Sequence, residues 1–440
     1  MTAPPSALFI AYHYPPRGGV AVLRTIKFLK YLHRFGWRLK VLTLKTRRYV
    51  VTDDTLGAEV PDSVDIVRLP DPGPAISKAA LALTRKRFAA RGFPDVESWW
   101  VPAAAAAAVD AVVRGRIPVI YTTSPPHSTH LVGEWCKRLT GVRWVADFRD
   151  TWADNPYFVE PAGWRRRWKE RLERRVVETA DVILANTPQA LDAFVARYPA
   201  HAEKFVWLPN GYDDDDFVTV PAPRPTPHPL TLMYVGSAGG TRPLDHFFAA
   251  LDELRRAGVP GAAELEVVFV GPISVKVQRQ VEALGLGAQV RFTGQLPHAE
   301  AVAEMYNCDV LLLLQFADHG GSTALPSKVF EYMKARKVIF GMTCEGPTSE
   351  LIRQYPAGFV TAPDDVPAIR EVLARLLDLH RRGALPTVDD DDDHIERFSR
   401  EALTRQLHDI MIGLLTVEEQ SEHSDPGRRR WRHKPRANMS

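Results

Sequence analysis

An acidic residue, Glu331, stands among apolar residues in the segment PSKVFEYMKARKVIFG, which the pattern predicts to be a short helix followed by a strand. Short apolar runs, CDVLLLLQ before it and KVIFGM at its end, are typical of buried parallel strands. Pro326 suits the first turn of the helix, because its ring fixes φ and its missing N–H is not needed there. A carboxylate can accept hydrogen bonds from two neighbouring hydroxyls. Glu331 is therefore a candidate for holding a ribose diol, the alternative being an exposed acid that pairs with Lys334 or Lys328.

The loop before this helix, HGGSTALPS, is a candidate site for a diphosphate. Gly320 and Gly321 allow a ligand to approach the backbone closely, and the N–H groups of the loop and of the helix N-terminus favour an anion. Further donors could come from Ser322, Thr323 and Lys328. A flexible turn that contains two glycines and binds nothing is the alternative.

A second group of polar residues follows two predicted strands of the amino-terminal half. His127, in SPPHSTH, comes between a strand end and a helix start, where an imidazole can orient or protonate a ligand. His130 is its rival and is expected on the helix surface. Asp147, Arg149 and Asp150 lie at the end of the strand in ADFRDTW and are also candidates, although an internal Asp–Arg ion pair would explain them as well.

The composition indicates a globular protein with more than one domain. The chain has 440 residues, of which 45% are hydrophobic and 25% are charged. Its net charge of +3 is too small for a dedicated nucleic-acid binder. Three widely spaced cysteines form no metal-ligand pattern and favour a reducing compartment. The sequence shows neither a secretory leader nor an apolar run of about 20 residues, which predicts a soluble or peripheral membrane protein.

Predicted strands and helices alternate in two series, which indicates an α/β protein with two Rossmann-like domains. The first domain is expected over residues 1–219. Five prolines predict an extended linker over residues 220–229, and the second domain is expected over residues 230–393. A helix over residues 394–417 is expected to cross back to the first domain. The basic residues 418–440 are expected to be a disordered tail.

An ordered series of segments carries a family resemblance. The series consists of HYPPRGGVAVLRTIKFLKYLHRFGWRLKVLTLK, SPPHSTHLVGEWCKRLTGVRWVADFRDTW, WLPNGYDDDDF, LTLMYVGSAGG, LEVVFVGP, VRFTGQLPHAEAVAEMYNCDVLLLL and PSKVFEYMKARKVIFG. Together these segments resemble the family 4 glycosyltransferases of the GT-B fold, of the subgroup with a PSKxxEY-type donor-site helix. The resemblance spans about residues 7–415. It implies two domains that face each other across a cleft and transfer a sugar from a nucleotide-diphosphate sugar to an acceptor hydroxyl, with retention of configuration.

The resemblance assigns the donor site to the second half of the chain. Glu331 matches the second glutamate of the family's E-x7-E motif, which is associated with the donor ribose. The position of the first glutamate, which contacts the donor sugar in the family, is held by Thr323. That sugar contact is therefore not carried over.

The turn VGSAGGTRPL is the expected neighbour of the donor phosphates. The family's arginine after Gly236 is replaced by Ser237, and the family's lysine position is held by Arg242. Arg242, with Lys328, is therefore expected to neutralise the diphosphate. A surface arginine next to a proline is the alternative for Arg242.

On the acceptor side, the resemblance places Gly18 and Gly19 close to the donor phosphates and the acceptor, with a tight turn as the alternative. Some members of the family have a histidine near this SPPHSTH turn that contacts the donor sugar, which supports His127 as a catalytic candidate beside Asp147. The acidic run from Asp213 to Asp216 is interpreted as a solvated turn. No cofactor and no metal are expected to be required, and the nucleotide sugar is the co-substrate.

The helix expected over residues 164–178, WRRRWKERLERRVVE, is basic and carries Trp164 and Trp168 four residues apart. Helices of this kind favour anionic membrane surfaces, and the basic tail would add to that attraction. A solvated face on which Glu170 and Glu173 form ion pairs is the alternative. The acceptor is expected to be a lipid-linked or cell-envelope glycan, and the protein is expected in the cytoplasm, at the inner face of the membrane.

Two other functions fit the same residues. A non-hydrolysing sugar-nucleotide epimerase would use the same fold without an acceptor. The replacements at Ser237 and Thr323 remove family charges, so a non-catalytic nucleotide-sugar-binding protein is the other alternative.

Overall fold

The structure, a computed structural model, describes residues 4–45, 52–53, 55–71, 94–95, 97–155, 162–218, 227–238, 244–315, 323–389 and 393–424. The chain groups into two compact units. The first unit contains Met1–Phe148, Gly163–Leu184 and Thr404–Ser440, and the second contains Arg149–Ala162 and Ala185–Leu403. Two parallel sheets are present, which confirms the predicted α/β fold with two Rossmann-like sheets.

The first sheet has the strand order β3-β2-β1-β4-β5-β6-β7. Strand β1 lies between β2 and β4, so that Phe9 lies opposite Val41 on one side and Tyr121 on the other. The residues of β1, β4 and β5 are almost all buried, as expected for parallel strands that are covered on both faces. The strands are β1 (Ser6–Ile10), β2 (Arg38–Lys45), β3 (Asp65–Pro70), β4 (Val119–Thr123), β5 (Arg143–Phe148), β6 (Val182–Ala185) and β7 (Phe205–Trp207).

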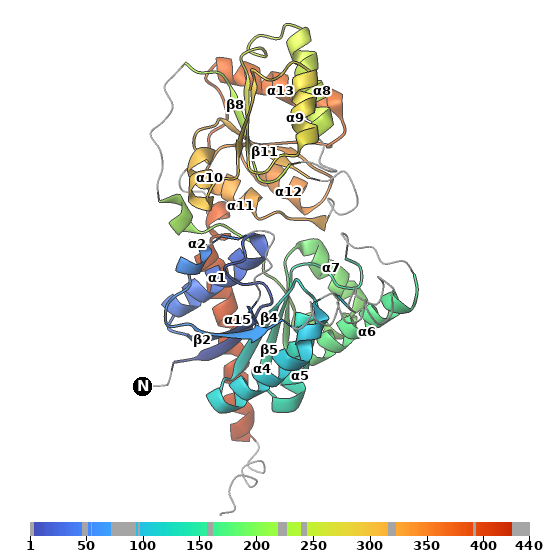
Figure 1. The fold of residues 1–440 in the computed structure, drawn as a ribbon, viewed down its shortest axis with the longest axis vertical. Coiled ribbons are helices and arrows are strands. Elements are labelled where there is room, and N and C mark those ends of the chain that lie inside the picture. Colours follow the sequence, from blue (N-terminus) through green and yellow to red (C-terminus); the bar gives the residue numbers. More distant parts are fainter. Residues whose placement is uncertain are drawn as a thin grey trace, which may run out of the picture. The chain divides into compact units, whose positions relative to one another are not determined.

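Right-handed connections place helix α1 on one face of this sheet and α4, α5 and α6 on the other. Figure 1 shows these last three helices, of which α4 packs on α5 and α5 packs on α6. Gly133 is required where α5 meets β5, because a Cβ at this position would lie 2.4 Å from the Trp144 indole. The helices are α1 (Val20–Arg34), α2 (Thr55–Ala58), η1 (Ser98–Trp100), α4 (Val101–Gly115), α5 (Thr129–Thr140) and α6 (Trp164–Thr179).

The second sheet has the order β10-β9-β8-β11-β12-β13, and its paired strands are parallel. Helices α8 and α13 pack against each other beside this sheet (Figure 1), and one continuous apolar core fills the unit. The strands are β8 (Thr231–Val235), β9 (Glu266–Val270), β10 (Val290–Gly294), β11 (Val310–Leu314), β12 (Val338–Met342) and β13 (Gly358–Thr361). The helices include α8 (Leu244–Arg256), α9 (Val275–Ala283), α10 (His298–Met305), α11 (Lys328–Lys334), α12 (Pro347–Gln354) and α13 (Val366–Arg381).

In each sheet the strand order reverses at one point, between β1 and β4 in the first and between β8 and β11 in the second. Ligands of open α/β sheets bind beyond the carboxyl ends of the strands at such a point. The loops after β1 and β4 contain Gly18, Gly19 and His127, and the loop after β8 contains Gly236 and Ser237. The topology thus brings predicted site residues to the carboxyl ends of the strands at the switch point of each sheet.

The carboxyl-terminal helix is longer than the sequence pattern indicated. The expected helix over residues 394–417 is observed as α14 (Asp393–Glu396) and α15 (Arg400–Ser424). The backbone of α15 continues through Gly413, and no proline interrupts it before Pro426. From Thr404 onward this helix belongs to the first unit, where the indole N–H of Trp37 donates to His408 Nδ1 at 2.9 Å. Most of the predicted linker and of the basic tail lies outside the described residues.

Candidate active site

In the second unit, helix α11 is fixed to the end of strand β8 by two side chains one turn apart. The Lys328 ammonium donates to the Val235 carbonyl at 2.7 Å and to the Tyr234 hydroxyl at 3.2 Å. It also lies 4.4 Å from the centre of the Tyr234 ring, a cation–π distance. The hydroxyl of Tyr332 accepts a hydrogen bond from the Val235 N–H at 3.0 Å. The first turn of α11 therefore lies directly against the loop that follows β8.

Gly236 is required at this contact. Its φ of 132° lies in the region that favours glycine, and a Cβ there would come within 2.5 Å of Lys328 Nζ. The next residue, Ser237, is held by its carbonyl, which accepts a hydrogen bond from the Tyr234 hydroxyl at 3.0 Å. The ammonium group of Lys328 and the backbone of Gly236 thus lie next to each other at the carboxyl end of β8. Tyr332 was missed as a site residue, although its spacing of four from Lys328 on a helix was a usable signal.

Glu331 lies on the same helix and is half-buried. Its neighbours Val329, Phe330 and Met333 are buried in the core, so the helix is firmly seated. Neither lysine proposed as its partner forms an ion pair with it, since Lys328 donates to the Val235 carbonyl of β8 and Lys334 forms an ion pair with Asp214 at 2.5 Å. Among the residues the structure describes, the Glu331 carboxylate has no hydrogen-bond partner, which leaves both oxygens available for a ligand.

The glycine loop before α11 is only partly visible. Gly320, Gly321 and Ser322 lie outside the described residues, as does Arg242 in the turn after β8. Thr323, the first described residue after the loop, is half-buried. The loop end is fixed by buried polar side chains, because Gln315 donates to the Ala324 carbonyl at 3.1 Å and to Thr348 at 2.8 Å.

In the first unit, the loop after β1 is held in place by polar contacts from neighbouring segments. Arg68 of β3 donates to the Pro15 carbonyl at 2.8 Å, and Arg17 is hydrogen-bonded to His13 at 2.6 Å. Gly18 is buried and Gly19 is exposed. Gly19 has a φ of 101° and precedes α1, and a Cβ added there would meet no atom within 4 Å. The conformation, rather than crowding, therefore requires glycine at this position.

The two histidines of the SPPHSTH turn have different environments. His127 is half-buried, with its ring 6.0 Å from that of Phe148, and it remains a candidate for contact with a ligand. His130 was predicted to face the helix surface, and this prediction is wrong. The ring of His130 is buried, stacks on Phe148 at 4.1 Å and is hydrogen-bonded to Thr122 at 2.8 Å, because its face of α5 packs on the sheet. Burial, with His127 nearby, lowers the pKa of His130 well below its ordinary value.

Asp147 is enclosed at the end of β5. It has no exposed surface and forms an ion pair with Arg24 of α1, whose two nitrogens donate at 2.9 and 3.1 Å. The hydroxyls of Tyr121 and Thr123 donate to it at 2.6 and 2.8 Å. Although burial alone would raise the pKa of Asp147, the charge of Arg24 and these hydrogen bonds lower it below its ordinary value. The internal Asp–Arg pair considered for this strand end exists, but its arginine, Arg24, comes from α1.

Two further carboxylates were missed, of which Asp95 lies close to His127 and Glu97 lies close to Asp95. Asp95 accepts a hydrogen bond from the backbone N–H of Ser128, the residue after His127, at 2.9 Å. Glu97 precedes the short helix η1. Burial, together with the negative charge of Asp95, raises the pKa of Glu97 from 4.5 to about 7. The two acids are separated by one residue in PDVESWW, and this spacing was the only sign in the sequence that they could act together.

The acidic run from Asp213 to Asp216 is not simply a solvated turn. Asp213 is buried and caps helix η3 (Asp214–Phe217) by accepting the N–H of Asp215 at 3.2 Å. Asp214 pairs with Lys334, and Asp216 lies 3.3 Å from His298 of α10. The run therefore fastens two helices of the second unit. Only Asp214 and Asp215 are exposed as predicted.

The fold is that of known two-domain glycosyltransferases. A glycosyltransferase from Rickettsia africae ESF-5 superposes with a TM-score of 0.69 at 13% identity, over 94% of this chain and 99% of the other. Sucrose-phosphate synthase from Thermosynechococcus elongatus superposes with a TM-score of 0.65 at 16% identity, over 94% and 100%. At these identities the likeness shows the fold alone.

Sequence comparison supplies the family. Residues 18–211 match the family model described as "Glycosyl transferase 4-like domain", and residues 222–384 match the family model described as "Glycosyl transferases group 1". The chain therefore belongs to the group 1 glycosyltransferases, family 4. It is also similar to "D-inositol 3-phosphate glycosyltransferase 1" of Catenulispora acidiphila, with 29% identity over 155 residues. That match covers 32% of this chain and only 37% of the relative's length.

None of the helices in the described part of the chain is long and apolar enough to cross a membrane.

Proposed function

We propose that the protein transfers a sugar from a nucleotide-diphosphate sugar to an acceptor hydroxyl with retention of configuration. The observation that carries this proposal is the placement of Lys328 and Glu331 on one short helix at the switch point of the second sheet. Lys328 lies at the backbone of Gly236, and Glu331 makes no hydrogen bond to any described residue. A cation beside a glycine turn suits a diphosphate, and a carboxylate three residues away suits a ribose diol.

The donor roles divide as follows. Glu331 would accept hydrogen bonds from the ribose hydroxyls, and Lys328 would offset the charge of the diphosphate as the bond to the sugar breaks. Arg242, with the loop that contains Gly320 and Gly321, would contribute further phosphate contacts, as the family resemblance implies. Tyr332 would act only by holding α11 against β8. The departing phosphate would help to take the acceptor proton.

The acceptor side is proposed at the loops after β1 and β4. His127 would contact the sugar, and Gly18 and Gly19 would let the substrates approach the backbone. Glu97, whose pKa of about 7 keeps it partly ionised at neutral pH, would accept a hydrogen bond from the acceptor hydroxyl. Because Asp147 has no exposed surface, we propose it as a positioning residue for this edge of the sheet, in place of the catalytic role expected from the sequence.

A lipid-linked or cell-envelope glycan is proposed as the acceptor, with docking at the inner face of the cell membrane. The support comes from helix α6, where Trp164 is 62% exposed and Trp168 is 45% exposed. Arg167, Arg171 and Arg174 are also exposed, at spacings that continue the same stripe. The alternative, a face neutralised by its own glutamates, holds only in part, since Arg166 pairs with Glu170 but Glu173 is buried. Aromatic and basic residues on one helix face favour an anionic lipid surface.

Replacement of Glu331 tests the donor site. Glu331→Ala should lower the affinity for the correct nucleotide diphosphate about ten- to a hundredfold, because a charge-assisted hydrogen bond contributes about 1.5–3 kcal/mol. Isothermal titration calorimetry measures the change, once thermal stabilisation by a panel of nucleotide diphosphates has identified the base. Glu350→Ala, which removes an exposed acid on α12, is the matched control and should bind normally. Equal affinity in the wild type and Glu331→Ala would remove Glu331 from the site.

The two alternative functions are separated by NMR of reaction mixtures. The family matches are to glycosyltransferases, which favours transfer over epimerisation. An epimerase would convert the nucleotide sugar in the absence of any acceptor. A non-catalytic binder would neither transfer the sugar nor slowly hydrolyse the donor. Transfer that depends on an added acceptor is the outcome expected here.

A further inference from the structure

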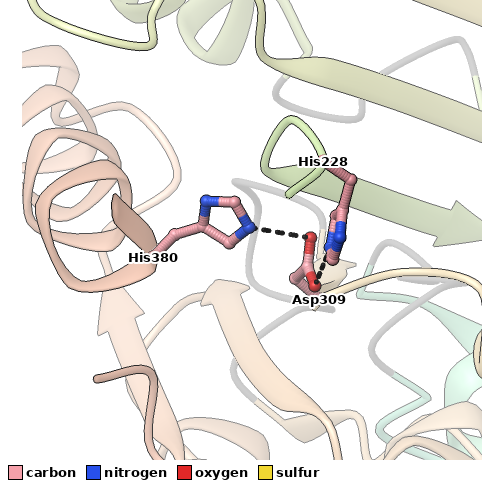
Figure 2. Close-up of side chains that lie close together, drawn as sticks. All are labelled: His228, Asp309 and His380. Carbon is pink, nitrogen blue, oxygen red and sulfur yellow. Dashed lines mark hydrogen bonds and ion pairs between the residues drawn. The ribbon is translucent and has the colours of Figure 1, made fainter. Parts of the chain in front are cut away.

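A cluster of side chains that can bind a metal lies at the amino ends of strands β8 and β11, whereas the proposed donor site lies at the carboxyl end of β8. His228 lies three residues before the start of β8, Asp309 immediately precedes β11, and His380 belongs to the last turn of α13. Figure 2 shows both imidazoles directed at the carboxylate from two sides. His228 Nε2 lies 3.1 Å from one oxygen of Asp309, and His380 Nε2 lies 3.8 Å from the other. The three ligand atoms all lie within 4.8 Å of one another.

We propose that these residues bind one Zn²⁺ ion. With Zn–N and Zn–O bonds of about 2.0–2.2 Å, two ligands of a tetrahedral ion stand about 3.3 Å apart. The separations of 3.1 and 3.8 Å are to different oxygens of Asp309, and one ligand atom from each residue lies within 4.8 Å of the other two, so side-chain rotations would bring three ligand atoms around one ion. Two imidazoles and one carboxylate suit Zn²⁺ and its transition-metal neighbours, whereas Mg²⁺ and Ca²⁺ prefer oxygen ligands.

The surroundings hold the ligands in place. The backbone N–H of Thr231 donates to Asp309 Oδ2 at 2.9 Å, and a contact of this kind orients a metal-binding carboxylate. His228 stands between Pro227 and Pro229, which restrict its backbone. The three side chains are between 16% and 18% exposed. A pocket of about 300 Å³, lined by both histidines and by Glu264 and Arg381, gives an ion access to them.

The position of the cluster predicts a structural role. The ion would join the last residues of the proline-rich segment to the sheet and to the end of α13, all within one unit. Strand β8 separates the cluster from Gly236 by five residues, or roughly 15 Å at the usual rise per residue. Zn²⁺ bound here would therefore stabilise the second unit without contact with the donor nucleotide. This role agrees with the expectation that transfer itself requires no metal.

Metal titration of the chelator-treated full-length protein tests the proposal. We expect equilibrium dialysis to find one tight Zn²⁺ per chain, and thermal unfolding to shift to higher temperature with Zn²⁺ but not with Mg²⁺. His380→Ala and Asp309→Asn should each lower the Zn²⁺ affinity at least about tenfold, since even the loss of outer-shell partners costs 10–100-fold. Co²⁺ in place of Zn²⁺ should give visible absorption bands that are lost in His380→Ala.

Two comparisons keep the result specific. His201→Ala removes a partly buried histidine of the same unit outside the cluster and should bind Zn²⁺ as the wild type does. His380→Ala lies on the outer end of a helix and should remain folded, with unchanged nucleotide affinity. If the wild type and His380→Ala bind Zn²⁺ equally, or if the wild type binds none at micromolar concentration, the cluster is only a hydrogen-bonded Asp–His group. Loss of nucleotide binding in Glu331→Ala is a separate result and would not change this outcome.

Discussion

The switch points of the two sheets differ in what their charged residues contact. In the second unit, Lys328 lies at the surface of a glycine turn, and the Glu331 carboxylate has no partner among the described residues. In the first unit, the carboxylate of Asp147 has no exposed surface and is held by Arg24 and by two hydroxyls. Of these two carboxylates, that of Glu331 is thus left for a ligand, whereas that of Asp147 is neutralised within the protein.

The difference fits the two kinds of ligand that a glycosyltransferase must hold. A nucleotide diphosphate carries negative charge and a diol, so its site needs exposed ionic groups. An acceptor hydroxyl is neutral, and the groups proposed to contact it at the first switch point are glycine backbone, His127 and Glu97, whose pKa is raised to about 7. The ion pair of Arg24 and Asp147 would serve here by joining α1 to β5, which fixes the loops that the acceptor would contact.

The strongest test of this contrast is the removal of the enclosed carboxylate. Asp147→Ala should lower the free energy of unfolding by about 3–5 kcal/mol, because it leaves the buried Arg24 guanidinium without its partner. Urea unfolding at pH 7 measures the loss. Glu331→Ala should change the free energy of unfolding by less than about 0.5 kcal/mol, since its carboxylate has no described partner. Similar losses in both variants would remove the distinction between the units.

The pH dependence of the same experiment has a defined sign. The folded-state pKa of Asp147 lies below its unfolded value, because Arg24 and the hydrogen bonds outweigh burial. The stability from this ionisation is therefore present above the unfolded pKa and is lost as the pH falls through the folded pKa. The difference between the wild type and Asp147→Ala should shrink in acid, and a constant difference would show that another contact is responsible.

The sequence predicted the fold, and it related the proposed donor residues to one another more directly than the residues of the first switch point, because of the distances along the chain. Lys328 and Glu331 lie three residues apart beside a strand, so helical spacing alone relates them. The partners Arg24 and Asp147 lie 123 residues apart, and no local pattern relates them. Periodicity also does not say which face of α5 packs on the sheet, which explains the wrong placement of His130.

Glu97 offers a smaller test of the first switch point. Its carboxylate should be required for acceptor use, so kcat/KM for the acceptor in the wild type should fall by up to about tenfold per pH unit below pH 7. Glu97→Gln should be less active at pH 8 and should lose this acid limb. Initial rates at constant donor concentration provide the measurement. A wild-type profile that is flat from pH 6 to 8 would exclude the role of Glu97.

Stability gives an independent readout of the same group. The folded-state pKa of Glu97, about 7, lies above its ordinary value of 4.5, because of burial and the charge of Asp95. The stability from this proton is present below the unfolded pKa and is lost as the pH rises through about 7. Glu97→Gln should therefore gain stability relative to the wild type between pH 5 and 8. No gain would show that Glu97 is solvated in solution.

The smallest effect is expected on helix α6, where the charge of the first unit is directed outward. Trp164→Ala with Trp168→Ala should lower binding to vesicles that contain anionic phospholipid about fivefold, or about 1 kcal/mol. Sedimentation of the protein with vesicles, at several salt concentrations, measures the partition. Val275→Ala, at a residue of the second unit that is 59% exposed, is the matched control and should bind normally. Equal partition of the tryptophan variant and the control would mean that α6 does not dock to lipid.

The wild-type protein should bind the vesicles more weakly as salt is added, because salt screens the attraction of its basic residues to the lipid head groups. If wild-type binding does not change with salt and is lost in the tryptophan variant, the tryptophans bind the lipid without help from the basic residues. The outward charge of α6 would then have no role in docking, and the contrast between the units would apply only to the two switch points.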